Sequence, residues 1–384
     1  MMKKVLFHFS KWFVGILFIF SGLIKANDPL GFGYKLQEYF EVFHISFLNG
    51  WATGIAVILC VLEIIFGALL LLGLFKNFVV KGLLATIIFF TFLTFVSAAF
   101  KVVTSCGCFG DAIPLTPWQS FSKDVVLLLL IIYIFINRNL IKPITEKPGL
   151  QSGLFSAVFA ASLIFSTFTY TRLPIIDFLP YKVGSSIPEN MKIPEGAPVD
   201  EYLIMYDLKN KQTGETKTMS DKDYMSKEVW KDENWEVVGS PSKKLVKKGY
   251  DVKIKDLMIT DASGTDYTKE IVENPYYNLI VVAYNLNETN EDAIAEANAL
   301  ALNAAEQFNI RTVLLTSNSA KDADKFSKRM KLFMEVFYAD AVPLKSMVRA
   351  NPGILLLKNG VIVNKWHYHS LPSFDNFTEK YFAK

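Results

Sequence analysis

Cysteine and histidine are scarce in this chain, which has three cysteines and four histidines in 384 residues. No cysteine follows Cys108, so the long remainder of the chain carries neither a disulfide framework nor a thiol. Runs of basic residues interleaved with aromatic ones are also missing, which argues against a nucleic-acid partner. The densest group of lysines, within residues 243–248, fits a solvated loop. Any thiol chemistry is therefore confined to the first part of the chain.

Charged residues are unevenly spread. They make up 20% of the chain, yet they are rare before Arg172, where long apolar runs dominate. A helix needs about 20 mostly apolar residues to cross the hydrocarbon core of a membrane. The runs that meet this requirement are Val5–Ile24, Trp51–Phe75, Gly82–Phe100, Trp118–Asn137 and Leu150–Thr171. The sequence therefore predicts an α-helical membrane bundle of about five transmembrane helices, in contact with membrane lipid.

The loops between these runs differ in charge. Three loops on one side of the predicted bundle collect basic residues, namely Lys3 and Lys4, Lys76 and Lys81, and Arg138, Lys142 and Lys147. Such residues mark the cytoplasmic side. The sequence thus predicts a bacterial inner-membrane protein with a cytoplasmic N-terminus and with everything after Arg172 in the periplasm. Residues 25–50 mix charged and aromatic side chains, which is typical of a loop and an amphipathic helix at the membrane surface.

Two charged residues lie within or at the end of the first two apolar runs. A carboxylate at mid-bilayer costs about 3 kcal/mol, so it normally faces the inside of a bundle and has a partner. Glu63 is such a group, and Lys25, at the outer end of the first run, is a candidate partner. One interpretation is a buried polar site for protons or a quinone headgroup. The other is an ion pair, or a protonated carboxyl, that only fixes helix packing.

Cys106 and Cys108 flank a single glycine in the loop between the third and fourth runs. The predicted periplasmic side is oxidising, so a dithiol there tends to become a disulfide. A disulfide across one residue closes a very small ring, and strain of this kind makes the bond easier to reduce. We therefore expect Cys106 and Cys108 to act as a redox pair. The alternatives are a staple for the loop, half of a metal site, or inert buried thiols; Cys60 is expected in the core.

Three motifs of the membrane half occur in order along the chain. They are Phe20–Lys25 with Asp28-Pro29 close behind, then Leu62–Gly67, and then Cys106–Gly110. The first two are similar to DoxX-type membrane proteins, and the third resembles the related MauE branch, the methylamine-utilisation membrane proteins. The resemblance covers roughly residues 5–140 and implies a four-helix membrane module. It also implies a role in disulfide formation or reduction during maturation of exported proteins; other DoxX-type proteins take part in quinone-linked oxidation of sulfur compounds.

A single cysteine pair is an incomplete electron relay. Because the chain has no second pair, electrons at Cys106 and Cys108 must pass to a bound quinone or to a partner protein. We therefore expect a client or carrier protein with thiols as the partner, and a quinone is the one candidate cofactor.

The part of the chain after Arg172 has the pattern of a water-soluble domain. Residues 179–198 are rich in Pro, Gly and Ser and predict a linker, and a β-hairpin is expected around Gly214. Further on, strand-like and helical runs alternate at 278–284, 292–308, 311–315 and 320–334. This alternation predicts a strand–helix–strand unit with a parallel pair of strands.

Asn351-Pro352 opens another apolar strand, and residues 358–360 turn the chain into its partner. This order of elements resembles a thioredoxin-like domain across roughly residues 245–384, with Pro352 at the family's cis-proline. The family's cysteine pair would follow the first strand, where residues 285–291 contain no thiol. The resemblance implies a redox-inactive α/β domain in which Asn351 and Pro352 form a candidate peptide-binding site. His367 and His369 are expected on an exposed strand face, with a metal pair as the alternative.

The predicted organisation has four parts. These are a DoxX/MauE-like four-helix membrane module (1–140), a fifth transmembrane helix (141–178), a linker and β-hairpin region (179–244) and a redox-inactive thioredoxin-like domain (245–384). The leading hypothesis is a thiol-disulfide redox role in maturation of exported proteins, through the Cys-Gly-Cys loop. The alternative is a non-enzymatic membrane anchor or scaffold whose thioredoxin-like domain binds an envelope partner. A transporter is a third hypothesis, which rests on Glu63 alone.

Overall fold

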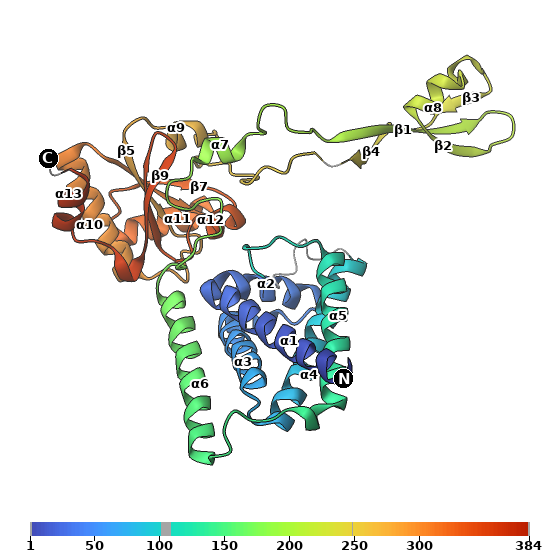
Figure 1. The fold of residues 1–384 in the computed structure, drawn as a ribbon. Coiled ribbons are helices and arrows are strands. Elements are labelled where there is room, and N and C mark those ends of the chain that lie inside the picture. Colours follow the sequence, from blue (N-terminus) through green and yellow to red (C-terminus); the bar gives the residue numbers. More distant parts are fainter. Residues whose placement is uncertain (1, 101–108, 248, 383–384) are drawn as a thin grey trace. The chain divides into compact units, whose positions relative to one another are not determined.

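The computed structural model describes residues 2–100, 109–247 and 249–382 (Figure 1). The chain forms two compact units. The larger unit joins Met1–Ser185 to Leu257–Lys384 and holds a helical bundle and an α/β domain, whereas the smaller unit comprises Ser186–Asp256.

Among the described residues, five helices are long and apolar enough to cross a membrane. They are α1 (Met2–Asn27), α3 (Ala52–Leu72, preceded by the 3-10 turn Ser46–Trp51), α4 (Lys76–Phe100), α5 (Pro117–Ile136) and α6 (Pro148–Thr171). The predicted bundle of five membrane helices is therefore confirmed. A short helix, α2 (Pro29–Val42), lies between α1 and α3 in the chain, and Asp28 caps it by accepting a hydrogen bond from the Gly31 amide at 2.9 Å.

Helix α3 is the most buried of the five and packs closely along α1. The close approach depends on glycine, as is common between membrane helices. A Cβ atom on Gly67 would lie 2.7 Å from the carbonyl oxygen of Gly15, and one on Gly22 would lie 3.0 Å from the carbonyl oxygen of Cys60. Cys60 itself is buried, as expected for a core residue. The α1–α3 contact therefore fixes the positions of Lys25 and Glu63, which these two helices carry.

We expect Gly67→Ala to destabilise the bundle by about 1–3 kcal/mol, because the added methyl group meets backbone rather than a movable side chain. Gly54→Ala in the same helix is the matched control, since nothing lies within 4 Å of its Cβ position. The control is expected to change stability by less than about 1 kcal/mol. Thermal unfolding of the detergent-solubilised protein measures both effects. Equal melting temperatures for the two variants would contradict a tight α1–α3 contact.

The α/β domain contains a five-stranded sheet in the order β7-β6-β5-β8-β9. Its strands are β5 (Tyr277–Val282), β6 (Arg311–Thr316), β7 (Glu335–Tyr338), β8 (Gly353–Lys358) and β9 (Val361–His367). β5, β6 and β7 run parallel, with Val281 opposite Leu314, and β8 and β9 continue the sheet antiparallel. The predicted parallel pair is thus present as β5 and β6.

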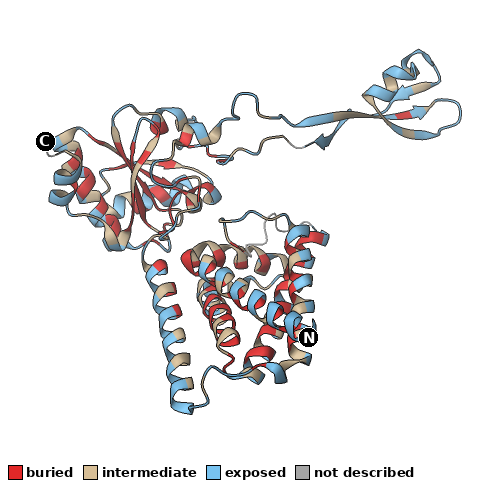
Figure 2. Cartoon of the chain, viewed as in Figure 1, coloured by how far each residue is buried: buried red, intermediate tan, exposed pale blue. Residues whose placement is uncertain are grey.

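Helices α10 (Glu291–Phe308), α11 (Ala320–Met330) and α13 (Phe374–Tyr381) share one hydrophobic core with the sheet (Figure 2). Its members include Leu279, Val281, Ile294 and Phe377, all buried. Alternate residues of β5, Ile280 and Val282, are also buried but face away from this core, as the period of a strand requires. Both faces of the sheet are therefore covered, and the shorter helices α9 (Thr268–Val272) and α12 (Ala341–Met347) complete the domain. This is the predicted α/β domain.

The smaller unit is built on a long strand, β1 (Glu201–Asn210), which pairs antiparallel with β2, β3 and β4. Their bounds are Thr216–Ser220, Trp235–Val237 and Ser242–Lys247, and the unit also holds α7 (Ile187–Met191) and α8 (Asp221–Ser226). β1 and β2 form a hairpin whose turn contains Gly214 at a φ of 73°. Most of the sheet is exposed and Leu208 is its one buried strand residue among those described (Figure 2).

Candidate functional site

Lys25 on α1 and Glu63 on α3 form an ion pair inside the bundle. Each side chain is 2% exposed. The ammonium group also lies 4.4 Å from the centre of the Phe90 ring. Within the described part of the chain, Oε2 of Glu63 has no hydrogen-bond partner. The structure therefore brings the two predicted residues together and leaves one buried acceptor atom unsatisfied.

A second ion pair lies close by on α5, between the buried Asp124 and the half-buried Lys123. Lys123 contacts Asp124 at 2.6 Å, and the hydroxyl group of Thr94 donates a hydrogen bond to Asp124 at 3.1 Å. A cavity of about 20 Å³ separates the two ion pairs, which is room for about one water molecule. We refer to Lys25, Glu63, Thr94, Lys123 and Asp124 as the buried polar cluster. The sequence marked Lys123 and Asp124 only as charges near the start of a span, so their part in this cluster was missed.

Cys106 and Cys108 lie outside the described residues. The chain is described again from Phe109, which is buried and packs against Phe20 with ring centres 5.7 Å apart. The ammonium group of Lys123 lies 5.0 Å from the centre of the Phe109 ring. The residue that follows Cys108 is thus held against the bundle next to the buried polar cluster.

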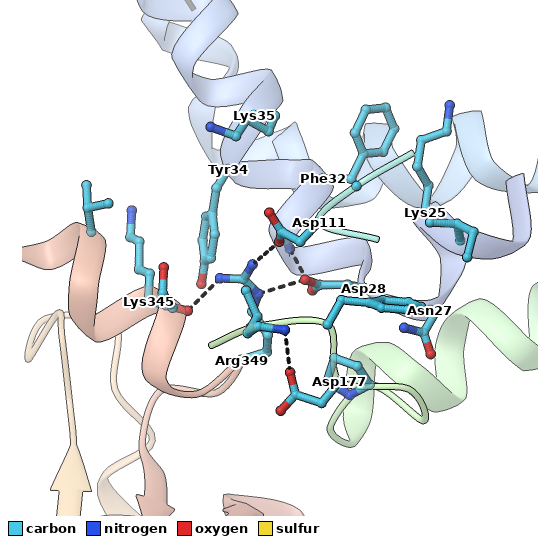
Figure 3. Close-up of a pocket in the computed structure, with 18 of the residues that line it drawn as sticks. Lys25, Asn27, Asp28, Phe32, Tyr34, Lys35, Asp111, Asp177, Lys345 and Arg349 are labelled. Carbon is cyan, nitrogen blue, oxygen red and sulfur yellow. Dashed lines mark hydrogen bonds and ion pairs between the residues drawn. The ribbon is translucent and has the colours of Figure 1, made fainter. Parts of the chain in front are cut away.

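A larger cavity of about 310 Å³ lies beside this point (Figure 3). Its wall is formed by α2, by Gly110 and Asp111, by residues 174–179 after the last membrane helix, and by α12 with Arg349. Lys25 lines both this cavity and the small one next to Glu63. Elements of the bundle and of the α/β domain therefore enclose one space, which the sequence did not indicate.

Arg349 crosses from the α/β domain to the bundle at this cavity (Figure 3). Its Nε donates to Asp28 at 2.8 Å, its Nη2 to Asp111 at 3.1 Å, and its Nη1 to the carbonyl oxygen of Lys345 at 2.6 Å. The arginine side chain is 7% exposed. Burial acts to lower the pKa of Arg349, but the carboxylates of Asp28 and Asp111 outweigh it, and the net pKa lies above the ordinary value. The guanidinium group is therefore permanently charged and paired.

Other contacts join the same two parts of the larger unit. The hydroxyl groups of Tyr34 on α2 and Tyr284 after β5 lie 2.8 Å apart, and Lys345 stacks over the Tyr34 ring at 4.5 Å. Burial is the main cause that raises the pKa of Tyr34 above its usual value. Lys365 on β9 pairs with Asp177 at 2.6 Å. Together with Arg349, these contacts form the docking interface between the bundle and the α/β domain.

The peptide bond between Asn351 and Pro352 is cis, as the resemblance implied. Pro352 is buried, the Asn351 carbonyl accepts a hydrogen bond from the Asn290 amide at 3.3 Å, and the Asn351 side chain donates to the Asn285 carbonyl at 2.8 Å. The cis-proline loop is therefore tied to the segment where a thioredoxin carries its cysteines. Peptide binding at Asn351 and Pro352 stays a prediction.

The two histidines after the sheet do not share an exposed strand face. His367 ends β9 and is buried, whereas His369 lies in the following 3-10 turn, Tyr368–Ser370. Nδ1 of His367 accepts a hydrogen bond from the His369 amide at 3.1 Å, and burial lowers the pKa of His367 to about 4. The expectation for His367 was wrong because its ring caps this turn. The described residues contain no cluster of ligands suited to a metal ion.

Comparison with known proteins gives a family match in the membrane half of the chain. Residues 3–137 match the family model described as methylamine utilisation protein MauE. The chain is also similar to protein TlpB of Flavobacterium psychrophilum, with 29% identity over 125 residues, which is 32% of this chain and 34% of TlpB. The chain thus spans about a third of the length of this relative. The N-terminal part is a MauE-like membrane domain, and a thioredoxin-like domain follows it.

Proposed function

We propose that the protein is a membrane thiol-disulfide exchange protein that acts on exported proteins through Cys106 and Cys108. The observation that carries the proposal is the position of Phe109, Gly110 and Asp111. The residues directly after Cys108 pack next to a buried polar cluster and then line the cavity of about 310 Å³. A MauE-like domain supports the same role through the resemblance described above.

The exchange is a two-step transfer of one electron pair. A client thiolate attacks one sulfur of the Cys106–Cys108 disulfide; the sulfur–sulfur bond breaks, and the second cysteine leaves as a thiolate and takes up a proton. Another client thiolate then attacks the mixed disulfide. The client gains a disulfide and loses two electrons, and Cys106 and Cys108 end as two thiols. The reverse sequence reduces a client.

A quinone is a proposed acceptor for the electrons of the reduced pair. The cavity next to Glu63 measures about 20 Å³ and does not fit a quinone ring, whereas ligand sites usually exceed about 300 Å³. No step of the exchange described above needs this group, and the acceptor we favour is a carrier protein whose own cysteines form a disulfide, which is reduced to two thiols as the Cys106–Cys108 disulfide forms again. We place the exchange on the periplasmic side of a bacterial inner membrane, because the basic loops belong on the other side.

Redox titration of the protein in isolated membranes tests the proposal. Membranes are equilibrated with glutathione buffers and free thiols are then blocked with a reagent that adds mass. We expect the Cys106–Cys108 pair to change state between about −120 and −270 mV, the range of known exchange proteins. The Cys106→Ser/Cys108→Ser variant is the control and should show no transition. A wild-type pair that never changes state would contradict the proposal.

A scaffold role is the second candidate. It is favoured by the thioredoxin-like domain, which lacks a thiol and is docked on α2 through Tyr34 and Tyr284. A scaffold would keep its envelope partner when both cysteines are replaced. Co-purification with the Cys106→Ser/Cys108→Ser variant therefore separates the two candidates.

A further inference from the structure

The cavity of about 20 Å³ inside the bundle is lined by charged groups from three membrane helices. Lys25 belongs to α1, Glu63 to α3, and Lys123 and Asp124 to α5. The rest of the wall is apolar apart from one hydroxyl group, and consists of Leu17, Phe18, Ser21, Ile87, Phe90 and Leu127. A space of this size holds about one small molecule, so its occupant lies beside both ion pairs at once.

Glu63 brings an acceptor atom without a partner to this cavity. Its Oε1 binds Lys25, whereas Oε2 has no hydrogen-bond partner within the described part of the chain. The side chain is 2% exposed, so bulk water does not reach this oxygen. Buried polar atoms in proteins are nearly always bonded to another protein group or to an ordered water molecule, because an unsatisfied one is costly. A hydrogen-bond donor is therefore expected in the cavity.

The charges around the cavity favour a neutral donor. The ammonium groups of Lys25 and Lys123 balance the carboxylates of Glu63 and Asp124, so no net charge is left to attract an ion. A cation would lie close to two ammonium groups, and an anion would lie close to two carboxylates. The described residues also contain no cluster of ligands suited to a metal ion. Water is neutral, donates two hydrogen bonds, and needs only about 10–15 Å³.

We propose that this cavity binds one water molecule, which donates one hydrogen bond to Oε2 of Glu63 and the other to the carboxylate of Asp124. A carboxylate offers about four acceptor positions, so Asp124 accepts this bond in addition to those from Lys123 and Thr94. The water joins the two ion pairs into one network that connects α1, α3, α4 and α5. This site does not depend on the proposed thiol exchange.

A crystal structure of the full-length protein, at a resolution that shows ordered waters, tests the site. We expect a peak about 2.5–3.0 Å from Oε2 of Glu63 and from one carboxylate oxygen of Asp124. The absence of a peak would overturn the proposal. An anomalous signal in the cavity, after rubidium replaces sodium in the buffer, would identify a cation and would also overturn it.

A double-mutant cycle tests whether the water joins the two ion pairs. Glu63→Gln and Asp124→Asn are made singly and together, and melting temperatures are measured in detergent. Because either change weakens the bonds of the same water, the combined loss in melting temperature should be smaller than the sum of the single losses. Single losses that add up to the combined loss would overturn the bridge between the ion pairs.

The same cycle in two further backgrounds separates the water from direct electrostatic coupling. Ser21→Thr adds a methyl group at the wall of the cavity and keeps the hydroxyl group, so we expect it to displace the water and to make the losses additive. Ser156→Thr is the matched control, since it adds the same group to an exposed residue of α6 and should leave the cycle unchanged. Equal coupling in both backgrounds would contradict a water bridge. If Ser21→Thr does not fold, the wild-type crystal structure decides.

Discussion

Lys25→Met is expected to destabilise the membrane bundle by about 3–5 kcal/mol, because it leaves the charge of Glu63 buried without a partner. Both side chains of the pair are 2% exposed. One oxygen of Glu63 already lacks a hydrogen bond among the described residues, and without Lys25 the other oxygen loses its ion-pair partner as well. Thermal unfolding in detergent, followed by circular dichroism, measures the loss.

Two further variants serve as controls for Lys25→Met. Lys35→Met breaks a surface pair with Glu38, whose side chains are 25% and 43% exposed, and should cost less than about 1 kcal/mol. The double variant Lys25→Met/Glu63→Leu removes both charges and is expected to recover most of the lost stability. If Lys25→Met lowered the stability as little as Lys35→Met does, the result would contradict a buried ion pair between Lys25 and Glu63.

The double variant also separates packing from function at the buried polar cluster. If it folds and still titrates with glutathione, the pair only fixes α1 against α3. If it folds but the cysteine pair no longer changes state, Lys25 and Glu63 take part in the exchange, for example by handling protons. Lys25 lines both cavities, so the ion pair lies next to the larger space as well as inside the bundle.

The membrane helices could be predicted from the sequence because the features that indicate them lie within short stretches of the chain. Each span is a continuous apolar run, and a charge such as Glu63 is conspicuous inside one. Even the pairing with Lys25 could be inferred, since few other charges lie at that depth. Lys123 and Asp124 lie near the start of a span, where charges are ordinary, so nothing pointed to the burial of Asp124.

The docking interface could not be predicted in the same way. Arg349 lies in an unremarkable stretch, and its partners are separated from it by hundreds of residues. The sequence around a single arginine does not predict which distant carboxylates will form ion pairs with it. Such contacts depend on how two folded parts pack, which local patterns of hydrophobicity do not encode.

One helix boundary was also missed for a physical reason. Apolar residues continue with helical spacing to Met334, which predicted a helix over 320–334, but α11 ends at Met330. Lys331 adopts a left-handed conformation with a φ of 50° and stops the helix. The left-handed residue that ends a helix is usually glycine, so a lysine at this position does not predict a helix end. The released residues lead into β7, a strand that the sequence did not indicate.

The largest functional effect is expected from replacing one cysteine of the pair. With Cys108→Ser, the Cys106 thiolate can attack a client disulfide, which breaks the client's sulfur–sulfur bond and leaves one client sulfur as a thiol. No second loop thiol is then present to attack the mixed disulfide, so it should persist. The reverse variant, Cys106→Ser, tests the other sulfur. The double variant is the control, because it has no loop thiol to trap. Cys60 is buried and does not compete.

The most direct test of thiol-disulfide exchange at Cys106 and Cys108 is therefore to trap the mixed disulfide in intact cells. Proteins are alkylated under acid conditions, separated without reductant and identified by mass spectrometry. We predict that at least one single-cysteine variant carries an exported protein, released by reductant and missing from the double variant. Adducts that are equally abundant in the double variant, or none in either single variant, would contradict exchange at Cys106 and Cys108.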